Sequence, residues 1–338
     1  MHVHLLVPDL IIPGADIRID AGEILLAKGR HTATAKQTPE SWLCKQYQLD
    51  DEGNEGAAGA FSLLGDGMPP ADGCWLRADP VHLRVDRDAL ILADSSVFSL
   101  TATEAGALTN SLNRHFAPRL QLQAVHPERW YARLDSPSDT RWTPLGEARG
   151  KPISGHLPAG EAAMRWHALM NEAQMLLHEH PVNEAREARG ELPVNSIWFW
   201  GGGKAQDLPH RPFAHVLSSD PLARGLAAAS GASATALPES AASWLRTTPD
   251  SGTTLIVLDS LRPSFAYGEL SGWAGRAAAL ERDWLAPLVT ALRAGRIGMI
   301  TTHLIGDGMS IDVETTRMDL RRFWRRRKPL RSYVAPTG

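Results

Sequence analysis

The feature that most constrains the fold is an unmixed apolar run, Thr254–Leu258, which is flanked by polar and glycine-containing segments. A strand that is apolar at every position must be covered on both faces, as in a parallel sheet with helices on either side. Two further short apolar runs, His4–Val7 and Ile297–Thr302, predict more strands of this sheet. Helices are predicted between them, one starting at Asp220-Pro221 and one across Leu280–Leu292. We therefore predict an α/β protein with a doubly wound, largely parallel sheet.

Residues 72–134 follow a different pattern, which predicts a small separate domain. Two strand-like segments form a hairpin, a helix follows from Thr103, and two more strand-like segments come after it. The order ββαββ suits a small antiparallel sheet backed by a helix. The Pro- and Gly-rich segment 135–160 has the composition of a linker. The predicted domains are an α/β core of residues 1–70 and 151–338, and an inserted ββαββ domain with its linker at 71–150.

The composition is that of an ordinary globular protein of 338 residues, with 43% hydrophobic and 22% charged residues. A formal net charge of −3 gives no overall attraction to nucleic acid or membrane. Two cysteines, Cys44 and Cys74, are too few for a disulfide framework. The chain shows no signal-peptide pattern and no apolar run of the roughly 18 residues that would cross a bilayer. We therefore expect a cytoplasmic protein.

One stretch, His180–Gly203, combines directional hydrogen-bonding side chains with a run of glycines. Its aromatic segment Ser196–Trp200 predicts a buried strand. A strand that leads into glycines is a common ligand site in α/β proteins, because bare backbone can approach a ligand closely. The predicted ligand-binding residues are Asn183, Arg186, Asn195, Gly201, Gly202 and Gly203.

These residues also have structural explanations, which stay open. The glycines match neither a P-loop nor a dinucleotide fingerprint, since Ala205 follows Lys204, and a tight turn that packs against another element would also need them. Arg186 either binds a phosphate or carboxylate with two hydrogen bonds, or forms a salt bridge with Glu184, Glu187 or a carboxylate from the sheet.

The same stretch resembles a known family. The order HPVN, R, G, PVN, an aromatic strand and G-x-G is similar to archaeal-type cofactor-independent phosphoglycerate mutases, which belong to the alkaline phosphatase superfamily. A second block, Gly59–Gly67 and Asp72–Asp79, resembles the opening of that family's inserted domain, and the resemblance is strongest over residues 57–112 and 178–203. The whole chain is also similar to bacterial RpfE-type regulatory proteins. The resemblance implies an alkaline-phosphatase-like α/β core.

The resemblance further implies two metal ions held by Asp and His, and a Ser or Thr nucleophile. This chain departs from that pattern at each motif. The first strand is followed by Asp9 alone, in place of D-G-x-x-D. Asp259 has Pro263 four residues on, where the family has His, and the last predicted strand ends in Thr302-His303 in place of Asp-His. No Ser or Thr matches the nucleophile, so we predict no catalytic residue, no metal ligand and no cofactor.

Our leading hypothesis is a catalytically degenerate phosphoglycerate-mutase-like protein with a regulatory or ligand-sensing role, and no enzymatic activity. The alternative is an active metal-dependent phosphoglycerate mutase or phosphomonoesterase with a rearranged site. The expected partner is a small phosphorylated or carboxylate ligand, and neither a membrane nor a particular protein partner follows from the sequence.

The C-terminal segment Arg321–Lys328 surrounds two aromatic residues with cations, a combination that can bind nucleic acid. Such a segment is more often a terminal helix whose aromatic side chains, here Phe323 and Trp324, dock on the protein while the cations stay in water. We therefore predict a docked helix and do not expect a nucleic-acid partner.

Overall fold

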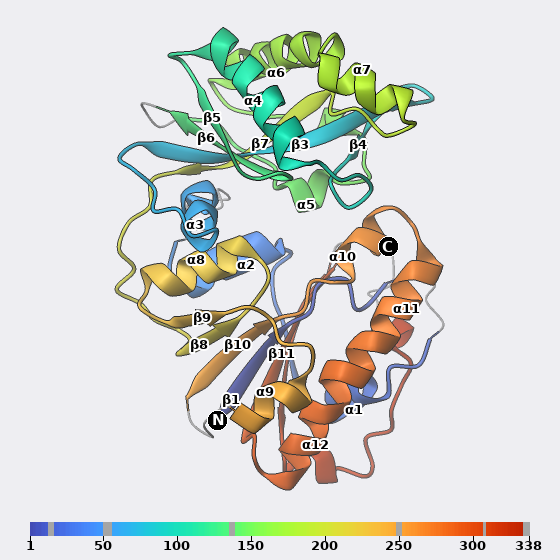
Figure 1. Cartoon of the computed structure of the whole chain (residues 1–338). Coiled ribbons are helices and arrows are strands. Elements are labelled where there is room, and N and C mark those ends of the chain that lie inside the picture. Colours follow the sequence, from blue (N-terminus) through green and yellow to red (C-terminus); the bar gives the residue numbers. More distant parts are fainter. Residues whose placement is uncertain (13–16, 50–55, 135–138, 248–251, 307–308, 334–338) are drawn as a thin grey trace. The chain divides into compact units, whose positions relative to one another are not determined.

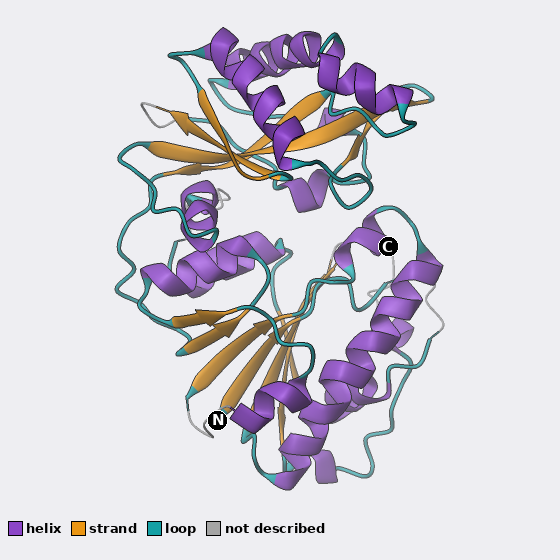
Figure 2. Cartoon of the chain, in the orientation of Figure 1, coloured by secondary structure: helices purple, strands orange, loops and turns teal. Residues whose placement is uncertain are grey.

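The computed structural model describes residues 1–12, 17–49, 56–134, 139–247, 252–306 and 309–333. The chain forms two compact units (Figure 1), one of Met1–Trp42 and Pro209–Gly338 and the other of Leu43–Leu208. Figure 2 shows that both units combine helices with a sheet. Within the described ranges, no helix is long and apolar enough to cross a lipid bilayer.

The first unit is built on a sheet whose described strands follow the order β2-β12-β11-β1-β10-β8-β9. Their bounds are β1 (His2–Leu6), β2 (Arg30–Ala33), β8 (His215–Leu217), β9 (Ser233–Thr235), β10 (Thr253–Val257), β11 (Met299–Gly306) and β12 (Met309–Thr316). The central strand β1 pairs in parallel with β10 and β11, and β8 and β9 extend the parallel part. At the other edge, β12 and β2 are antiparallel.

Helices lie on both faces of this sheet, with α8 on one face and α1, α9, α11 and α12 on the other (Figure 1). Their bounds, with the shorter helical turns, are α1 (Asp20–Lys28), α2 (Pro39–Gln46), α8 (Pro221–Ala229), α9 (Ala241–Thr247), α10 (Arg262–Ala266), α11 (Leu270–Leu280), the π-helical turn η2 (Glu281–Leu285), α12 (Ala286–Ala294), η3 (Asp319–Arg321) and η4 (Leu330–Tyr333). Local signals fix several ends: Asp220 accepts a hydrogen bond from the Ala223 amide at 2.9 Å, and Gly295 ends α12 with φ of 82°. The predicted α/β class, with a largely parallel sheet, is therefore confirmed.

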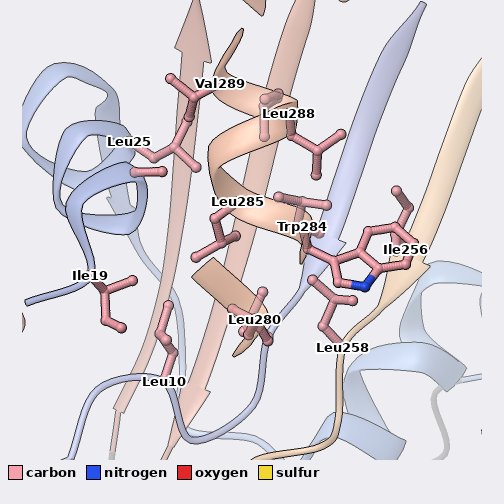
Figure 3. Close-up of a cluster of buried hydrophobic side chains, with 14 of the residues drawn as sticks. Leu10, Ile19, Leu25, Ile256, Leu258, Leu280, Trp284, Leu285, Leu288 and Val289 are labelled. Atoms are coloured by element: carbon pink, nitrogen blue, oxygen red, sulfur yellow. The ribbon is translucent and has the colours of Figure 1, made fainter. Parts of the chain in front are cut away.

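An apolar core of the first unit lies between its sheet and the helices α11 and α12 (Figure 3). On β1, Val3 and Leu5 point into this core, because successive side chains of a strand alternate between faces. Leu285, Leu288 and other apolar side chains of η2 and α12 pack against them. The opposite face of β1 carries His2 and His4, so one face of the sheet is apolar and the other is partly polar.

The second unit contains an antiparallel sheet in the order β4-β3-β6-β5, with β7 paired to β3. Its elements are α3 (Ala58–Gly65), β3 (Cys74–Asp86), β4 (Ala89–Ala93), α4 (Ala102–Phe116), β5 (Gln121–His126), β6 (Arg129–Leu134), α5 (Leu145–Ala148), η1 (Ile153–Gly155), α6 (Ala163–His178), α7 (Pro181–Ala188) and β7 (Ser196–Gly203). The predicted ββαββ order corresponds to β3, β4, α4, β5 and β6. A capping box of Thr101 and Glu104 starts α4, as the sequence at that position favours.

The structure divides the chain differently from the predicted domains. Residues 151–208 belong to the second unit with the ββαββ segment, because β7 pairs antiparallel with β3 rather than joining the parallel sheet. Residues 43–70 are also grouped with this unit, in which α3 packs on β3 and β7.

Two further predictions about local structure are wrong. The last strand, β11, runs on to Gly306 and is followed by β12. The C-terminal segment is not a docked helix: only a short turn covers Asp319–Arg321, and the side chains of Phe323 and Trp324 are 85% and 65% exposed.

Candidate functional site

The predicted ligand residue Asn183 lies on α7, where it is buried and holds the chain around it. Its amide nitrogen donates to the carbonyls of Leu177 and Val194 at 2.7 and 2.8 Å, and its oxygen accepts from the Val194 amide at 2.9 Å. The side chain therefore joins the end of α6 to the segment that leads into β7. All of these bonds are internal to the fold.

Arg186, one turn further along α7, is only 1% exposed. Its Nε donates to the Leu192 carbonyl at 2.8 Å, and its guanidinium lies 3.3 Å from Glu104 and 3.4 Å from Glu191. The guanidinium also lies over the ring of Phe98, at 6.0 Å from the ring centre. Of the two explanations left open by the sequence, the geometry matches the salt bridge, although with partners other than those named there.

Asn195 links two strands of the second unit. Its oxygen accepts from the Leu83 amide at 2.7 Å and its nitrogen donates to the Leu83 carbonyl at 2.9 Å. This pair of bonds extends the pairing of β7 with β3 by one step.

The three glycines do not form a loop, because Gly201–Gly203 are the last residues of β7 itself. Gly201 and Gly203 lie against the start of α3: a Cβ placed on Gly203 would be 2.6 Å from the Ala57 Cβ, and one on Gly201 would be 2.9 Å from the Ala58 Cβ. A Cβ on Gly202 would instead be 2.8 Å from the Leu76 Cδ2. Gly201 also has φ of 67°, a conformation that favours glycine. Close packing thus accounts for the glycines. The ligand role of all six residues stays a prediction.

A different group of polar side chains gathers in the first unit, where the parallel strands end. Asp9 follows β1, Asp259 follows β10 and Asp220 follows β8. Because these three strands are parallel, all three residues lie at the carboxyl ends of the strands, on the same side of the sheet. The chain crosses from β10 to β11 on the far side of β1, and such a change of direction is where open α/β sheets bind ligands. We call Asp9, Glu40, Asp220, Asp259 and Arg262 the strand-end cluster.

Arg262 is the only cation of the strand-end cluster. Its guanidinium donates to Glu40 at 2.8 Å, and it interacts electrostatically with Asp9 and Asp259 as well. Burial alone would lower the pKa of Arg262, but the charge and hydrogen bond of Glu40, followed by Asp9 and Asp259, raise it above its ordinary value. Arg262 is therefore permanently charged and compensates part of the acidic charge around it.

Asp220 titrates unusually high within this cluster. Burial has the largest effect and raises the pKa of Asp220 to about 6, and the charges of Asp259 and Glu40 raise it as well. The hydrogen bond from the Ala223 amide and the charge of Arg262 lower it. Its carboxyl group can therefore exchange a proton near neutral pH.

Asp9 has an unusual backbone conformation, with φ of 57°. The fold holds it there: its amide donates to the Ile305 carbonyl at 2.9 Å, and its carbonyl accepts from the Trp273 indole at 2.8 Å. Non-glycine residues in this conformation are uncommon and often mark functional positions.

A pocket of about 260 Å³ adjoins the strand-end cluster at Asp259. Buried apolar side chains such as Leu258, Leu280 and Trp284 line its floor. Figure 3 labels these three side chains within the apolar core. Its rim carries charged side chains, namely Glu239, Asp259, Arg276 and Asp283. Apolar walls with a few polar groups are typical of small-molecule sites.

The residues present do not fit the two metal ions that the resemblance implies. Within the part of the chain that the structure describes, no group of three or more His, Cys, Asp or Glu side chains is placed to hold a metal. The strand-end cluster contains no imidazole, and its carboxylates share Arg262. His303 does not stand at the strand end: within β11 its two ring nitrogens lie 2.9 Å from His4 and 2.8 Å from Asp312.

The sequence alone missed Glu40 and Arg262. Glu40 looks like an ordinary acid in the first turn of a helix, and Arg262 lies in a Pro-containing segment without a motif. The available signal was the pair Asp9 and Asp259, each of which comes just after a predicted parallel strand.

Sequence comparison finds relatives over part of the chain. A protein of Methanothrix thermoacetophila, named 2,3-bisphosphoglycerate-independent phosphoglycerate mutase, is 34% identical over 146 residues, which are 42% of this chain and 37% of the relative. A protein of Geobacter sulfurreducens, named as a probable mutase of the same type, is 40% identical over 93 residues, 26% of this chain and 23% of the relative.

These relatives are cofactor-independent phosphoglycerate mutases. The chain spans less than half of the length of either of them. A Pyrococcus horikoshii protein of known structure has a similar fold, with a TM-score of 0.54 and 15% identity over 92% of this chain and 86% of that one. No protein-family model matches the chain. The similarity to RpfE-type regulatory proteins stays a prediction.

Proposed function

We propose that this protein is a catalytically degenerate relative of the cofactor-independent phosphoglycerate mutases, which binds a small ligand at the strand-end cluster and acts in regulation or ligand sensing. The observation that carries this proposal is Arg262. Its guanidinium supplies fixed positive charge among carboxylates at the sheet edge, where the resemblance implies metal ions. A guanidinium can neutralise carboxylates, but it cannot activate a water or hydroxyl as a metal does.

The charge balance of the site narrows the ligand class. The strand-end cluster has four carboxyl groups against one guanidinium, and Glu239 and Asp283 add acidic charge at the pocket rim against Arg276. Without a metal, this balance repels a free phosphate and attracts an ammonium group. We therefore expect a small amine with an apolar portion for the floor of the pocket. The phosphorylated or carboxylate ligand expected from the sequence remains a prediction for the His180–Gly203 stretch.

The test compares two ligand classes on the full chain by thermal unfolding, since a ligand that binds only the folded state raises the melting temperature. Small diamines at millimolar concentration should raise it at constant ionic strength, and 2- and 3-phosphoglycerate should not. Asp259→Asn should remove most of the amine shift. The matched control is Asp86→Asn, an exposed aspartate at the end of β3, which should leave the shift unchanged.

The alternative, an active phosphoglycerate mutase or phosphatase, has one observation in its favour: four carboxyl groups converge at one sheet edge. Elemental analysis and a mutase assay with added Mg²⁺, Mn²⁺ or Zn²⁺ separate the two proposals. Protein that retains about two metal ions per chain and interconverts the phosphoglycerates would establish the enzyme and refute our proposal.

A further inference from the structure

The loop 321–328 belongs to the first unit, and the chain is anchored to that unit on both sides of the loop. Before it, Asp319 is buried and accepts hydrogen bonds from the Thr316 amide and hydroxyl, at 2.9 and 2.7 Å. After it, Leu330 is buried in the core. Between these anchors, the side chains from 323 to 328 are exposed. The loop is therefore held in place while its side chains face solvent.

Lys28, the last residue of α1, fixes the path of this loop. Its ammonium group donates to the carbonyls of Arg322 and Arg325 at 2.5 and 2.6 Å. In return, the Arg325 guanidinium donates to the carbonyls of Lys28 and Gly29 at 3.2 and 2.6 Å. These reciprocal bonds hold the loop against the end of the helix.

Two large aromatic side chains project from the loop. Phe323 and Trp324 are 85% and 65% exposed, and their rings meet edge to face with centres 5.1 Å apart. Exposed adjacent aromatic rings have no packing role in this fold. They leave flat apolar faces free to stack with another flat group.

Cations surround these rings, and several of them make no ion pair with a carboxylate in the described part of the chain, although Arg325 interacts electrostatically with Asp319. In the described part of the chain, Arg322 pairs with Asp319 and Arg327 pairs with Asp20. The nearby cations that make no ion pair there with a carboxylate are Lys28, Arg293, Arg321, Arg325, Arg326 and Lys328. In a chain of net charge −3, this is a local concentration of positive charge.

The cations and one of the rings also line a groove of about 640 Å³. Besides Phe323, its lining includes Arg18, Lys28, Arg293 and the arginines 325–327. A groove suits a narrow polyanion better than a flat bilayer surface. Arginine also outnumbers lysine in this loop, and a planar guanidinium both stacks on bases and binds phosphate with two hydrogen bonds.

We propose that the loop 321–328 and its groove bind single-stranded nucleic acid. Phosphates lie along the cationic groove, and one or two bases stack on Phe323 and Trp324. This arrangement of a positively charged groove with aromatic stacking positions is how proteins bind single strands without reading their sequence. The site goes beyond the function proposed above and does not depend on it.

The first experiment measures the binding of the full chain to fluorescein-labelled 12-nucleotide oligo(dT) and oligo(U) by fluorescence anisotropy. With about four phosphates contacted, affinity should fall about 50-fold between 50 and 200 mM salt. Vesicles that contain phosphatidylserine serve as the competing surface. Binding to these vesicles, with no binding of either oligonucleotide at 50 mM salt, would overturn the proposal in favour of a membrane contact.

The second experiment separates stacking from charge. Trp324→Ala should weaken binding about tenfold with an unchanged salt slope, since the loss of stacking on one base removes no phosphate contact. Arg326→Ala should weaken binding and reduce the salt slope by about 0.7. The controls are Met164→Ala, an exposed apolar side chain, and Arg84→Ala, an exposed cation of the second unit. Equal losses in the controls would refute the assignment of the site to this loop.

Discussion

His4 should make the first unit lose stability in mild acid. Its Nδ1 lies 2.9 Å from the His303 Nε2, and its ring packs against His2 and the edge of Phe213. Burial, followed by the charges that His2 and His303 can carry, lowers the pKa of His4 from 6.5 to about 3. The folded protein therefore keeps His4 neutral at a pH where the unfolded chain protonates it.

The sign and size of the effect follow from this difference. The unfolded state binds more protons below pH 6.5, so the free energy of unfolding falls as the pH drops from about 6.5 towards 3. Between pH 7 and pH 5 the loss from His4 alone is about 2 kcal/mol, at roughly 1.4 kcal/mol per pH unit below the unfolded pKa. This figure depends little on the folded pKa, provided that it stays below about 4.5.

The assay is urea unfolding at pH 7, 6 and 5, followed by tryptophan fluorescence, for the wild-type chain and for His4→Asn. The Asn side chain places an amide close to the position of Nδ1 but does not titrate. The loss of stability between pH 7 and pH 5 should be about 2 kcal/mol smaller in His4→Asn than in the wild type. His178→Asn, at the exposed end of α6, serves as the control and should behave as the wild type. An equal acid loss in His4→Asn would refute the reasoning.

Four further substitutions test the structure. Arg262→Ala removes a guanidinium that compensates part of the acidic charge of the strand-end cluster, so millimolar Mg²⁺ or Mn²⁺ should raise its melting temperature but not that of the wild type or of the exposed-site control Arg282→Ala. Gly203→Ala should destabilise by about 1–3 kcal/mol, as measured by urea unfolding, because its Cβ would lie 2.6 Å from that of Ala57. Gly275→Ala, in α11 with open space around it, should instead stabilise by about 0.5–1 kcal/mol. Arg186→Ala should cost about 3 kcal/mol by the same measurement, because it empties a buried site, leaves the Leu192 carbonyl without its donor and removes one of the two arginines paired with Glu104. A near-neutral result would favour the ligand role.

Elements with local signals could be predicted from the sequence. The apolar run at 254–258 became the buried strand β10, and Asp220-Pro221 began α8 with the expected cap. The ββαββ order of the second unit was also predictable, since hairpins and a capped amphipathic helix depend on neighbouring residues. In each case the information lies within a few residues of the element.

The missed elements depend on distant pairings. The sequence predicts β7 as a strand, but its partner β3 lies more than a hundred residues earlier. The residues around β7 therefore could not indicate which sheet it joins. The strands β2 and β12 were not predicted, because they are mostly polar and contain no apolar run. β12 forms by pairing with β11, and β2 forms by pairing with β12, which lies far away in the sequence. The glycines after Trp200 look the same in sequence whether they approach a ligand or the start of α3.

The strand-end cluster shows why site prediction needs topology. Asp9, Asp220 and Asp259 are spread over 250 positions. Asp9 and Asp259 stand at incomplete motifs of the resemblance, and Asp220 stands in none. They meet because β1, β8 and β10 run in parallel and end at one edge of the sheet. Once the strands that end together are known, the charges of the side chains at their ends can be added. In the function proposed above, Arg262 supplies the positive charge in this sum that metal ions would supply in the resemblance. Under the function proposed above, the guanidinium of Arg262 among these carboxylates therefore matters more than the motifs that the chain lacks.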